Sequence, residues 1–84
     1  MRYQVALKSS AEKELDALPT VIRPRVTARP LALEDNPRPS GIKKLQGSES
    51  YRLRIGDYRV LYRVDDQTRV VMVFAIGHRR EIYR

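Results

Sequence analysis

The 84-residue sequence contains no cysteine and only one histidine, His78. Disulfide scaffolds and thiolate zinc sites are therefore excluded, and one imidazole argues against a metal site built from protein ligands alone. Long hydrophobic runs are also missing, because the longest uncharged apolar stretch, 70–77, is far too short to span a bilayer. The first residues alternate polar and apolar side chains and lack a signal-peptide core. We therefore expect a cytoplasmic protein without a metal, a cofactor or a membrane partner.

Acidic side chains are scarce: 10 of them stand against 17 basic ones, which gives a net charge of +7 and a pI near 10.3. Thirteen of the basic residues are arginines, and 10 of the 17 basic residues fall in 43–84. The planar fork of arginine matches phosphate better than the point charge of lysine. The excess indicates a polyanionic partner, most simply nucleic acid. The alternative is a charge that only keeps the surface soluble.

The chain length allows one domain, residues 1–84, with a small core. Alternation over 2–8 predicts a strand. Ser9 and Glu12 have the spacing of a capping box, which predicts a helix from there to about Leu18.

A second helix is expected over 21–35. Pro24 fits the first turn of this helix, whereas Pro30 should kink it. The segment 36–41 has the composition of a loop.

Four further segments, 42–46, 50–55, 58–64 and 69–77, have the alternation or β-propensity of strands. Gly56-Asp57 is a two-residue hairpin signal between the second and third of them. The pattern predicts an α+β fold with an N-terminal strand, two helices and an antiparallel β-meander. We expect the helices to pack on one face of a twisted sheet.

The hairpin turn fixes which residues share a face, because side chains alternate along each strand. One face is apolar and should meet the helices: Tyr51, Leu53, Ile55, Tyr58, Val60, Tyr62 and Val64. The other face carries four arginines and a leucine: Arg52, Arg54, Arg59, Leu61 and Arg63. Arg54 should lie opposite Arg59, a like-charge pair that costs up to about 1 kcal/mol. A solvated outer face is the plain interpretation, and an anion site is the alternative that we favour.

The last strand should bring the C-terminal residues to this arginine face. We expect Val70, Met72, Phe74 and Ile76 on its apolar side, with Val73 beside Arg59 and Phe74 beside Tyr58. Gly77 should then lie next to the Gly56-Asp57 turn, and residues 78–84 should emerge close to Arg54 and Arg59.

Such a cluster suits cleavage of RNA by its own 2′-hydroxyl. One group would take the 2′ proton, cations would stabilise the pentacovalent phosphate, and one group would protonate the leaving 5′ oxygen. Tyr83 and His78 are the candidate proton-transfer groups. Tyrosine is a poor base at its ordinary pKa, and neighbouring guanidinium groups lower that pKa.

Three segments in chain order resemble the RelE branch of the RelE/ParE toxin superfamily. They are 36–47 (NPRPSGIKKLQG), 51–62 (YRLRIGDYRVLY) and 76–83 (IGHRREIY). The resemblance implies a small cytoplasmic toxin of a type II toxin–antitoxin module, which enters the ribosomal A site and cuts mRNA without a metal. It also implies a cognate antitoxin, which we expect to contribute an acidic, partly disordered segment. The ribosome and mRNA are the other implied partners.

The resemblance also implies roles for individual residues. Arg59 and Arg79 correspond to groups that bind phosphate or stabilise charge. Tyr83 corresponds to the group that orients or activates the 2′-hydroxyl, with His78 as the open alternative. The remaining expected phosphate contacts are Arg52, Arg54, Arg63, Arg80 and Arg84.

Two other functions share this pattern. ParE relatives have the same fold but bind and inhibit DNA gyrase, usually without the basic-plus-tyrosine set. A plain RNA-binding module is the other alternative, although the arginine face lacks interleaved aromatic side chains.

Overall fold

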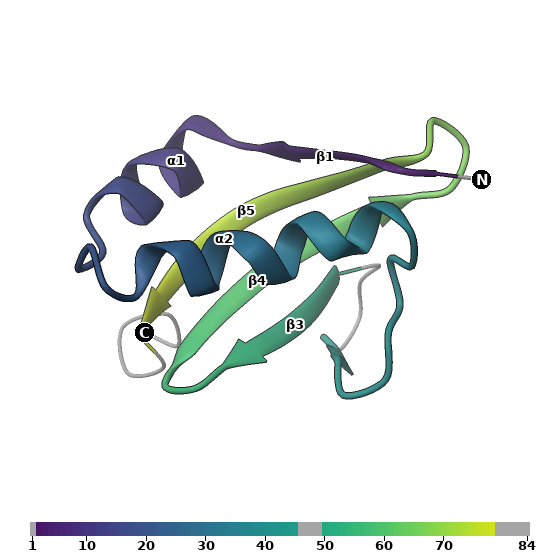
Figure 1. Ribbon diagram of the computed structural model, residues 1–84. Helices are drawn as coiled ribbons and strands as arrows, with labels where there is room; N and C mark the ends of the chain where they lie inside the picture. The colour runs from purple at the N-terminus through teal and green to yellow at the C-terminus, as the bar shows by residue number, and fades with distance from the viewer. Residues whose placement is uncertain (1, 46–49, 79–84) are drawn as a thin grey trace.

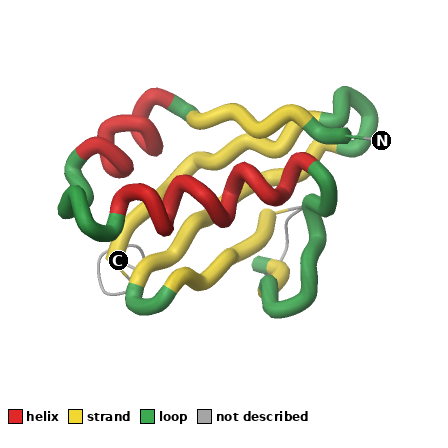
Figure 2. The backbone as a smooth tube through the Cα atoms, in the orientation of Figure 1, coloured by secondary structure: helices red, strands yellow, loops and turns green. Residues whose placement is uncertain are grey.

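The computed structural model describes residues 2–45 and 50–78, and its main feature is one five-stranded sheet with strand order β1-β5-β4-β3-β2 (Figure 1). The elements are β1 (Gln4–Leu7), α1 (Ser9–Asp16), α2 (Arg23–Leu31), a 3₁₀ turn (Ala32–Glu34), β2 (Lys43–Lys44), β3 (Ser50–Ile55), β4 (Tyr58–Asp65) and β5 (Val70–His78). Both helices lie on the same face of the sheet (Figure 2). The predicted α+β fold is confirmed, and β1 adds a parallel pair with β5 that the sequence pattern did not indicate.

The first helix begins without the predicted capping box. Lys8 occupies the N-cap position, so Ser9 lies inside the first turn, and no side chain caps the helix. The Lys8 N–H donates to the Val73 carbonyl, which holds Lys8 in extended geometry at the end of β1. The sheet hydrogen bond therefore fixes where the helix starts, and α1 ends at Asp16, two residues before the predicted Leu18.

Proline shapes both ends of the second helix. Pro24 lies in the first turn as predicted, where its missing N–H costs nothing. Pro30 lies one residue before the end of α2, and the chain continues from Ala32 in 3₁₀ geometry. The predicted helix over 21–35 is thus a shorter α-helix followed by a 3₁₀ turn.

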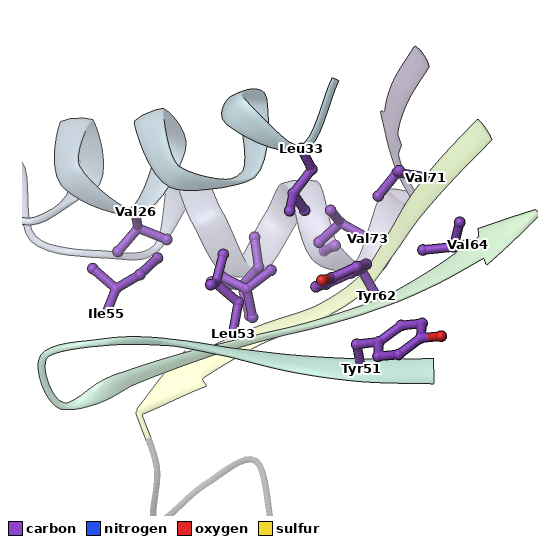
Figure 3. Packing of buried hydrophobic residues seen from close by; sticks show 12 residues of the cluster. Val26, Leu33, Tyr51, Leu53, Ile55, Tyr62, Val64, Val71 and Val73 are labelled. Carbon is purple, nitrogen blue, oxygen red and sulfur yellow. The ribbon is translucent and has the colours of Figure 1, made fainter. Parts of the chain in front are cut away.

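The β3–β4 hairpin has the predicted register. Ile55 pairs with Tyr58 and Arg54 with Arg59 around the two-residue turn. Every apolar residue predicted on the inner face is buried except Tyr58, which is half-buried against the core. Figure 3 shows this core between sheet and helices. Its members are Ala11, Val26, Leu33, Tyr51, Leu53, Ile55, Val60, Tyr62, Val64, Val71, Val73 and Ile76.

The predicted register of the last strand is wrong. Leu61 pairs with Ala75 and Tyr62 with Val73, so Phe74 is an extra residue in a β-bulge. The bulge reverses the alternation of faces along β5. Ile76 is buried as expected, but before the bulge Val71 and Val73 are buried instead. The three side chains expected inside are only half-buried and lie on the opposite face: Val70, Met72 and Phe74.

A polar cluster ties the 36–41 loop to the sheet end far from the hairpin turn. The Arg38 guanidinium donates to both Asp66 carboxylate oxygens, at 3.1 and 2.9 Å, and to the Tyr51 hydroxyl at 2.9 Å. The Tyr3 hydroxyl also donates to Asp66, at 2.6 Å. These two donors, Arg38 first, hold the pKa of Asp66 below its usual value.

A buried hydrogen bond holds the same loop from the core side. The Tyr62 hydroxyl donates to the Pro37 carbonyl at 2.8 Å. Burial raises the pKa of Tyr62 to about 12. The loop that leads from the helices into the sheet is therefore anchored at both Pro37 and Arg38.

Candidate functional site

The four predicted arginines of the hairpin share the sheet face that the helices leave uncovered. Their alternation with the buried Leu53, Val60 and Tyr62 fixes this orientation. They differ in exposure: Arg54 and Arg63 are exposed, Arg52 is half-buried and Arg59 is buried. The face predicted from the hairpin is thus confirmed as a group, and Arg59 differs from the others.

Arg59 is only 7% exposed, the one buried charged side chain among the described residues. Its Nε and Nη1 atoms are buried and have no hydrogen-bond partner in the part of the chain that the structure describes. Leaving buried donors unpaired costs about 1–3 kcal/mol, and more for a charged group. An anion with oxygen acceptors would supply the missing partners, and phosphate matches the guanidinium fork.

Sequence reasoning placed Arg59 correctly but missed its burial. The alternation of strand residues reports which face a side chain occupies, and it does not report how deeply neighbours cover it. The central position of β4 between β3 and β5 is the feature that could have indicated this burial.

Arg54 lies opposite Arg59 in the register, as predicted, and the two like charges are not paired with an acid in the described contacts. The Arg54 Nε donates to the Gly56 carbonyl at 3.1 Å. This bond ties the exposed Arg54 side chain to the hairpin turn. The hairpin turn therefore holds the Arg54 cation beside the buried Arg59.

His78 ends β5 at the same end of the sheet. It lies opposite Tyr58, and the two rings make an edge-to-face contact with centroids 5.6 Å apart and planes at 85°. Its neighbour Gly77 lies opposite Arg59. His78 is therefore one residue from the register position of Arg59, but its ring lies with Tyr58 on the helix-covered face, whereas the Arg59 guanidinium lies on the opposite face.

The helical layer supports this end of β5 through a residue that the sequence analysis did not single out. In the described sheet, β1 pairs with Val70–Val73 only, so it does not reach the last part of β5. The Glu14 carboxylate of α1 accepts the Ile76 backbone N–H at 3.1 Å. Glu14 thus accepts a β5 backbone N–H at a point that β1 no longer reaches. This N–H belongs to Ile76, two residues before His78.

The other predicted site residues lie outside the described residues: Arg79, Arg80, Tyr83 and Arg84. Their convergence on Arg54 and Arg59 stays a prediction. Within 2–45 and 50–78, no group of three or more His, Asp or Glu side chains is arranged to hold a metal ion. No helix in these ranges is both long and apolar enough to cross a membrane.

Comparison with known proteins gives consistent matches over the whole chain. Residues 5–83 match the family model described as "ParE toxin of type II toxin-antitoxin system, parDE". The chain is 34% identical to Toxin RelG of Mycobacterium tuberculosis, covering 100% of this chain and 99% of that protein. It is 33% identical to the putative toxin RelE1 of Methanocaldococcus jannaschii, with 100% and 98% covered.

Solved structures with the same fold include toxin–antitoxin complexes. The RelBE2 complex of Mycobacterium tuberculosis matches with a TM-score of 0.83 and 29% identity, over 94% of this chain and 100% of that chain. The archaeal RelE–RelB complex of Pyrococcus horikoshii OT3 matches with a TM-score of 0.82 and 32% identity, over 94% and 97%.

Proposed function

Because this chain belongs to the RelE/ParE superfamily of toxins from type II toxin–antitoxin modules, we propose that it is an endoribonuclease that cuts mRNA in the ribosomal A site. The toxin acts in the cytoplasm on translating ribosomes and thereby inhibits translation. A cognate antitoxin, which includes an acidic and partly disordered segment, binds and neutralises it. No metal and no cofactor takes part.

The observation that carries this proposal is the buried Arg59 guanidinium, two of whose donors have no partner among residues 2–45 and 50–78. A protein that needed only a soluble outer face would gain stability from an apolar or acidic residue at this position. Keeping an unpaired cation there makes sense if an anionic group binds it during function. The scissile phosphate of RNA is such a group, and Arg54 in the opposite strand adds positive charge nearby.

The proposed reaction uses the RNA's own 2′-hydroxyl as nucleophile. The 2′ oxygen attacks the adjacent phosphorus, the bond from phosphorus to the 5′ oxygen breaks, and a 2′,3′-cyclic phosphate and a 5′-hydroxyl form. Arg59 and Arg79 stabilise the charge of the pentacovalent phosphate. Tyr83 or His78 takes the 2′ proton, and a protonated group of the same cluster gives a proton to the leaving oxygen.

The remaining arginines hold the RNA backbone. Phosphate contacts supply affinity without reading base sequence. The proposed contacts are Arg52, Arg54, Arg63, Arg80 and Arg84. Binding to the ribosome should therefore weaken as salt concentration rises.

A ParE-like gyrase inhibitor is the second candidate, because the matching family model is described as ParE toxin. In that case the arginine face would bind a protein, and RNA would stay intact. The segment 76–83 with Arg79 and Tyr83 favours the nuclease, since a protein binder needs no proton-transfer residue.

The test is a comparison of two assays with the purified toxin. We expect cleavage of mRNA in the A site of purified ribosomes, and no inhibition of gyrase supercoiling at the same concentrations. Zinc- and manganese-specific chelators should leave cleavage intact, because they do not remove the magnesium that ribosomes need. Gyrase inhibition without mRNA cleavage would overturn the nuclease assignment in favour of the second candidate.

A further inference from the structure

The last part of β5 has no strand partner on the side of β1. In the described sheet, β1 pairs with β5 only from Val70 to Val73. The Lys8 N–H extends this pairing by one bond, to the Val73 carbonyl at 2.9 Å, and the bulge at Phe74 follows directly. Beyond the bulge, β4 is the one strand of the described chain that pairs with β5. A strand end that is paired on one side only has fewer backbone hydrogen bonds to hold its direction.

This strand end leads into the site of the proposed reaction. Gly77 lies opposite Arg59, and His78 is the last residue of the strand. The covalent chain then continues to Arg79 and Tyr83. A displacement of about 1 Å at a reacting group can lower a rate by about 10²-fold. The direction in which β5 ends therefore matters for the reaction.

A side chain of α1 takes the place of a strand at this point. The Glu14 Oε1 atom accepts the Ile76 backbone N–H at 3.1 Å. Helix α1 packs against β5 on the side where β1 ends (Figure 1). Ile76 is buried, and an unpaired backbone N–H in a buried residue costs free energy, so this bond resists displacement.

The pattern of α1 explains how Glu14 reaches the sheet. Ala11 is buried and Leu15 packs half-buried against the core, so these two residues define the helix face that meets the sheet. Glu14 lies three residues after Ala11, at the edge of the same face. It is also exposed to solvent. The helix thus presents a carboxylate oxygen to β5 without burying the whole charge.

The second helix holds the end of α1 in turn. The Arg23 Nη2 atom donates to the Asp16 carbonyl at 2.8 Å and to the Leu18 carbonyl at 3.2 Å. Asp16 is the last residue of α1, two residues after Glu14. Carbonyl groups at the end of a helix have no acceptor role within the helix, and a cation satisfies them. The helical turn that carries Glu14 is therefore fixed to α2 as well as to the core.

We propose that Glu14 is a positioning residue for the proposed RNA cleavage. It holds the end of β5 on the side that β1 leaves open, so that β4 and Glu14 together determine where the chain passes Arg59. Glu14 acts through the backbone of Ile76 and does not itself contact RNA. The inference rests on the proposed function for the reaction that it affects. It adds a residue of the helical layer, away from the arginine face.

The test compares Glu14→Ala with Glu14→Gln. Alanine removes the acceptor, whereas the carbonyl oxygen of glutamine can still accept the N–H. Glu14→Ala should slow single-turnover cleavage of A-site mRNA by about tenfold or more at saturating ribosome concentration. Its ribosome affinity should change by less than about twofold, because the phosphate contacts of the arginines are kept. Glu14→Gln should recover most of the lost rate. Cleavage by Glu14→Gln as slow as that by Glu14→Ala would overturn the proposal, because the charge and not the hydrogen bond would then matter.

Two controls separate positioning from the loss of a charge and from the loss of stability. Glu12→Ala removes an exposed carboxylate from the same helix. Tyr62→Phe removes a buried hydrogen bond to the Pro37 carbonyl, at the end of the sheet far from the hairpin turn. Both variants should cleave mRNA at close to the parent rate. Slowing in either control equal to that of Glu14→Ala would overturn the proposal, because charge or stability would then account for the effect.

Amide hydrogen exchange reports on the strand end without any RNA. In Glu14→Ala, the Ile76 amide should exchange about tenfold faster or more, because it loses its acceptor. The Lys8 amide should keep the parent rate, because its bond to the Val73 carbonyl is not altered. Unchanged exchange at Ile76 would overturn the proposal, since the end of β5 would then be held without Glu14.

The two readouts distinguish failure of this inference from failure of the proposed function. A toxin that never cleaves mRNA would refute the proposed function, while faster exchange at Ile76 would still show that Glu14 holds the end of β5. Parent-like cleavage by Glu14→Ala would refute the positioning role and leave the proposed function standing.

Discussion

Arg59 on β4 lies opposite Gly77 on β5, one residue before β5 ends at His78. The buried guanidinium therefore has a neighbour without a side chain on one strand, and on the other strand it faces Arg54. This arrangement leaves two buried donors unpaired within the described residues. An unpaired buried cation lowers the stability of the fold but favours the binding of an anion. Both effects can be measured in a variant at this position.

Replacing Arg59 with methionine should stabilise the fold and impair function. Methionine fills much of the same volume, removes the unpaired donors and relieves the repulsion from Arg54. We expect the free energy of unfolding to rise by about 1 kcal/mol or more. Cleavage of A-site mRNA should fall by about 10²-fold or more, because the phosphate loses its buried cation. Urea unfolding and single-turnover cleavage measure the two effects.

Arg63→Met is the matched control for this variant, because Arg63 is exposed on the same strand. Its stability should change little, since no buried donor is relieved. A loss of stability in Arg59→Met would contradict the interpretation, because it would mean that the guanidinium makes a net favourable contact in the free protein.

Removing the hydroxyl of Tyr83 should slow the chemistry without weakening binding. Tyr83→Phe keeps the ring and removes only the hydroxyl. If that hydroxyl acts on the 2′ oxygen, cleavage should slow by on the order of 10²-fold or more. Ribosome affinity should barely change, because it depends on the phosphate contacts of the arginines. Single-turnover cleavage and a separate ribosome-binding assay measure the two quantities. Near-normal cleavage by Tyr83→Phe, with a large loss in His78→Gln, would transfer the proton-transfer role to His78.

The hairpin shows what local sequence determines. A two-residue turn at Gly56-Asp57 leaves one register for the flanking strands, and the alternation of Leu53 and Val60 then fixes the faces. The arginine face follows directly from these local rules. The same reasoning could not show that Arg59 is buried, because burial depends on β5 and on how the sheet assembles around β4.

The error in β5 shows where local pattern is insufficient. Val70 to Ile76 is apolar throughout, so alternation cannot choose a face, and we expected one uninterrupted period. The bulge at Phe74 lets Val73 and Ile76 both point inward. A bulge depends on the fit between strands and leaves no composition signal here. The parallel pairing of β1 with β5 is likewise a property of the assembled sheet.

The pKa of Asp66 predicts an acid-dependent loss of stability. Its folded pKa is lowered, so the Arg38 and Tyr3 contacts stabilise the fold above the unfolded pKa, about 3.9, and this contribution is lost as pH falls through the folded pKa. Asp66→Asn should lower the thermal midpoint at pH 7, and its deficit should shrink as the pH falls below about 4. Thermal melts over this pH range test the expectation.

Tyr3→Phe is the control for Asp66→Asn, because it removes one donor and keeps the bidentate Arg38 contact. Tyr3→Phe should lower the thermal midpoint at pH 7 by less than Asp66→Asn does, since Arg38 is the larger cause of the Asp66 pKa shift. A deficit of Asp66→Asn that stays constant down to the lowest pH would show that the carboxylate charge is not what stabilises the loop.

The raised pKa of Tyr62 predicts that the fold loses stability as the pH rises into the alkaline range, whereas Asp66 predicts a loss as the pH falls. Burial raises its pKa to about 12, so the folded state keeps the proton while the unfolded state loses it above about pH 10. The parent protein should therefore lose stability between about pH 10 and about pH 12. Tyr62→Phe removes this titration together with the hydrogen bond to Pro37, and should cost about 1–2 kcal/mol at pH 7. The difference in free energy of unfolding between Tyr62→Phe and the parent should become smaller as the pH rises above about 10. Denaturant unfolding at pH 7 and at pH 11 measures this difference. An equal difference in free energy of unfolding at the two pH values would mean that the Tyr62 hydroxyl titrates normally. It would then follow that the 36–41 loop opens before the core does.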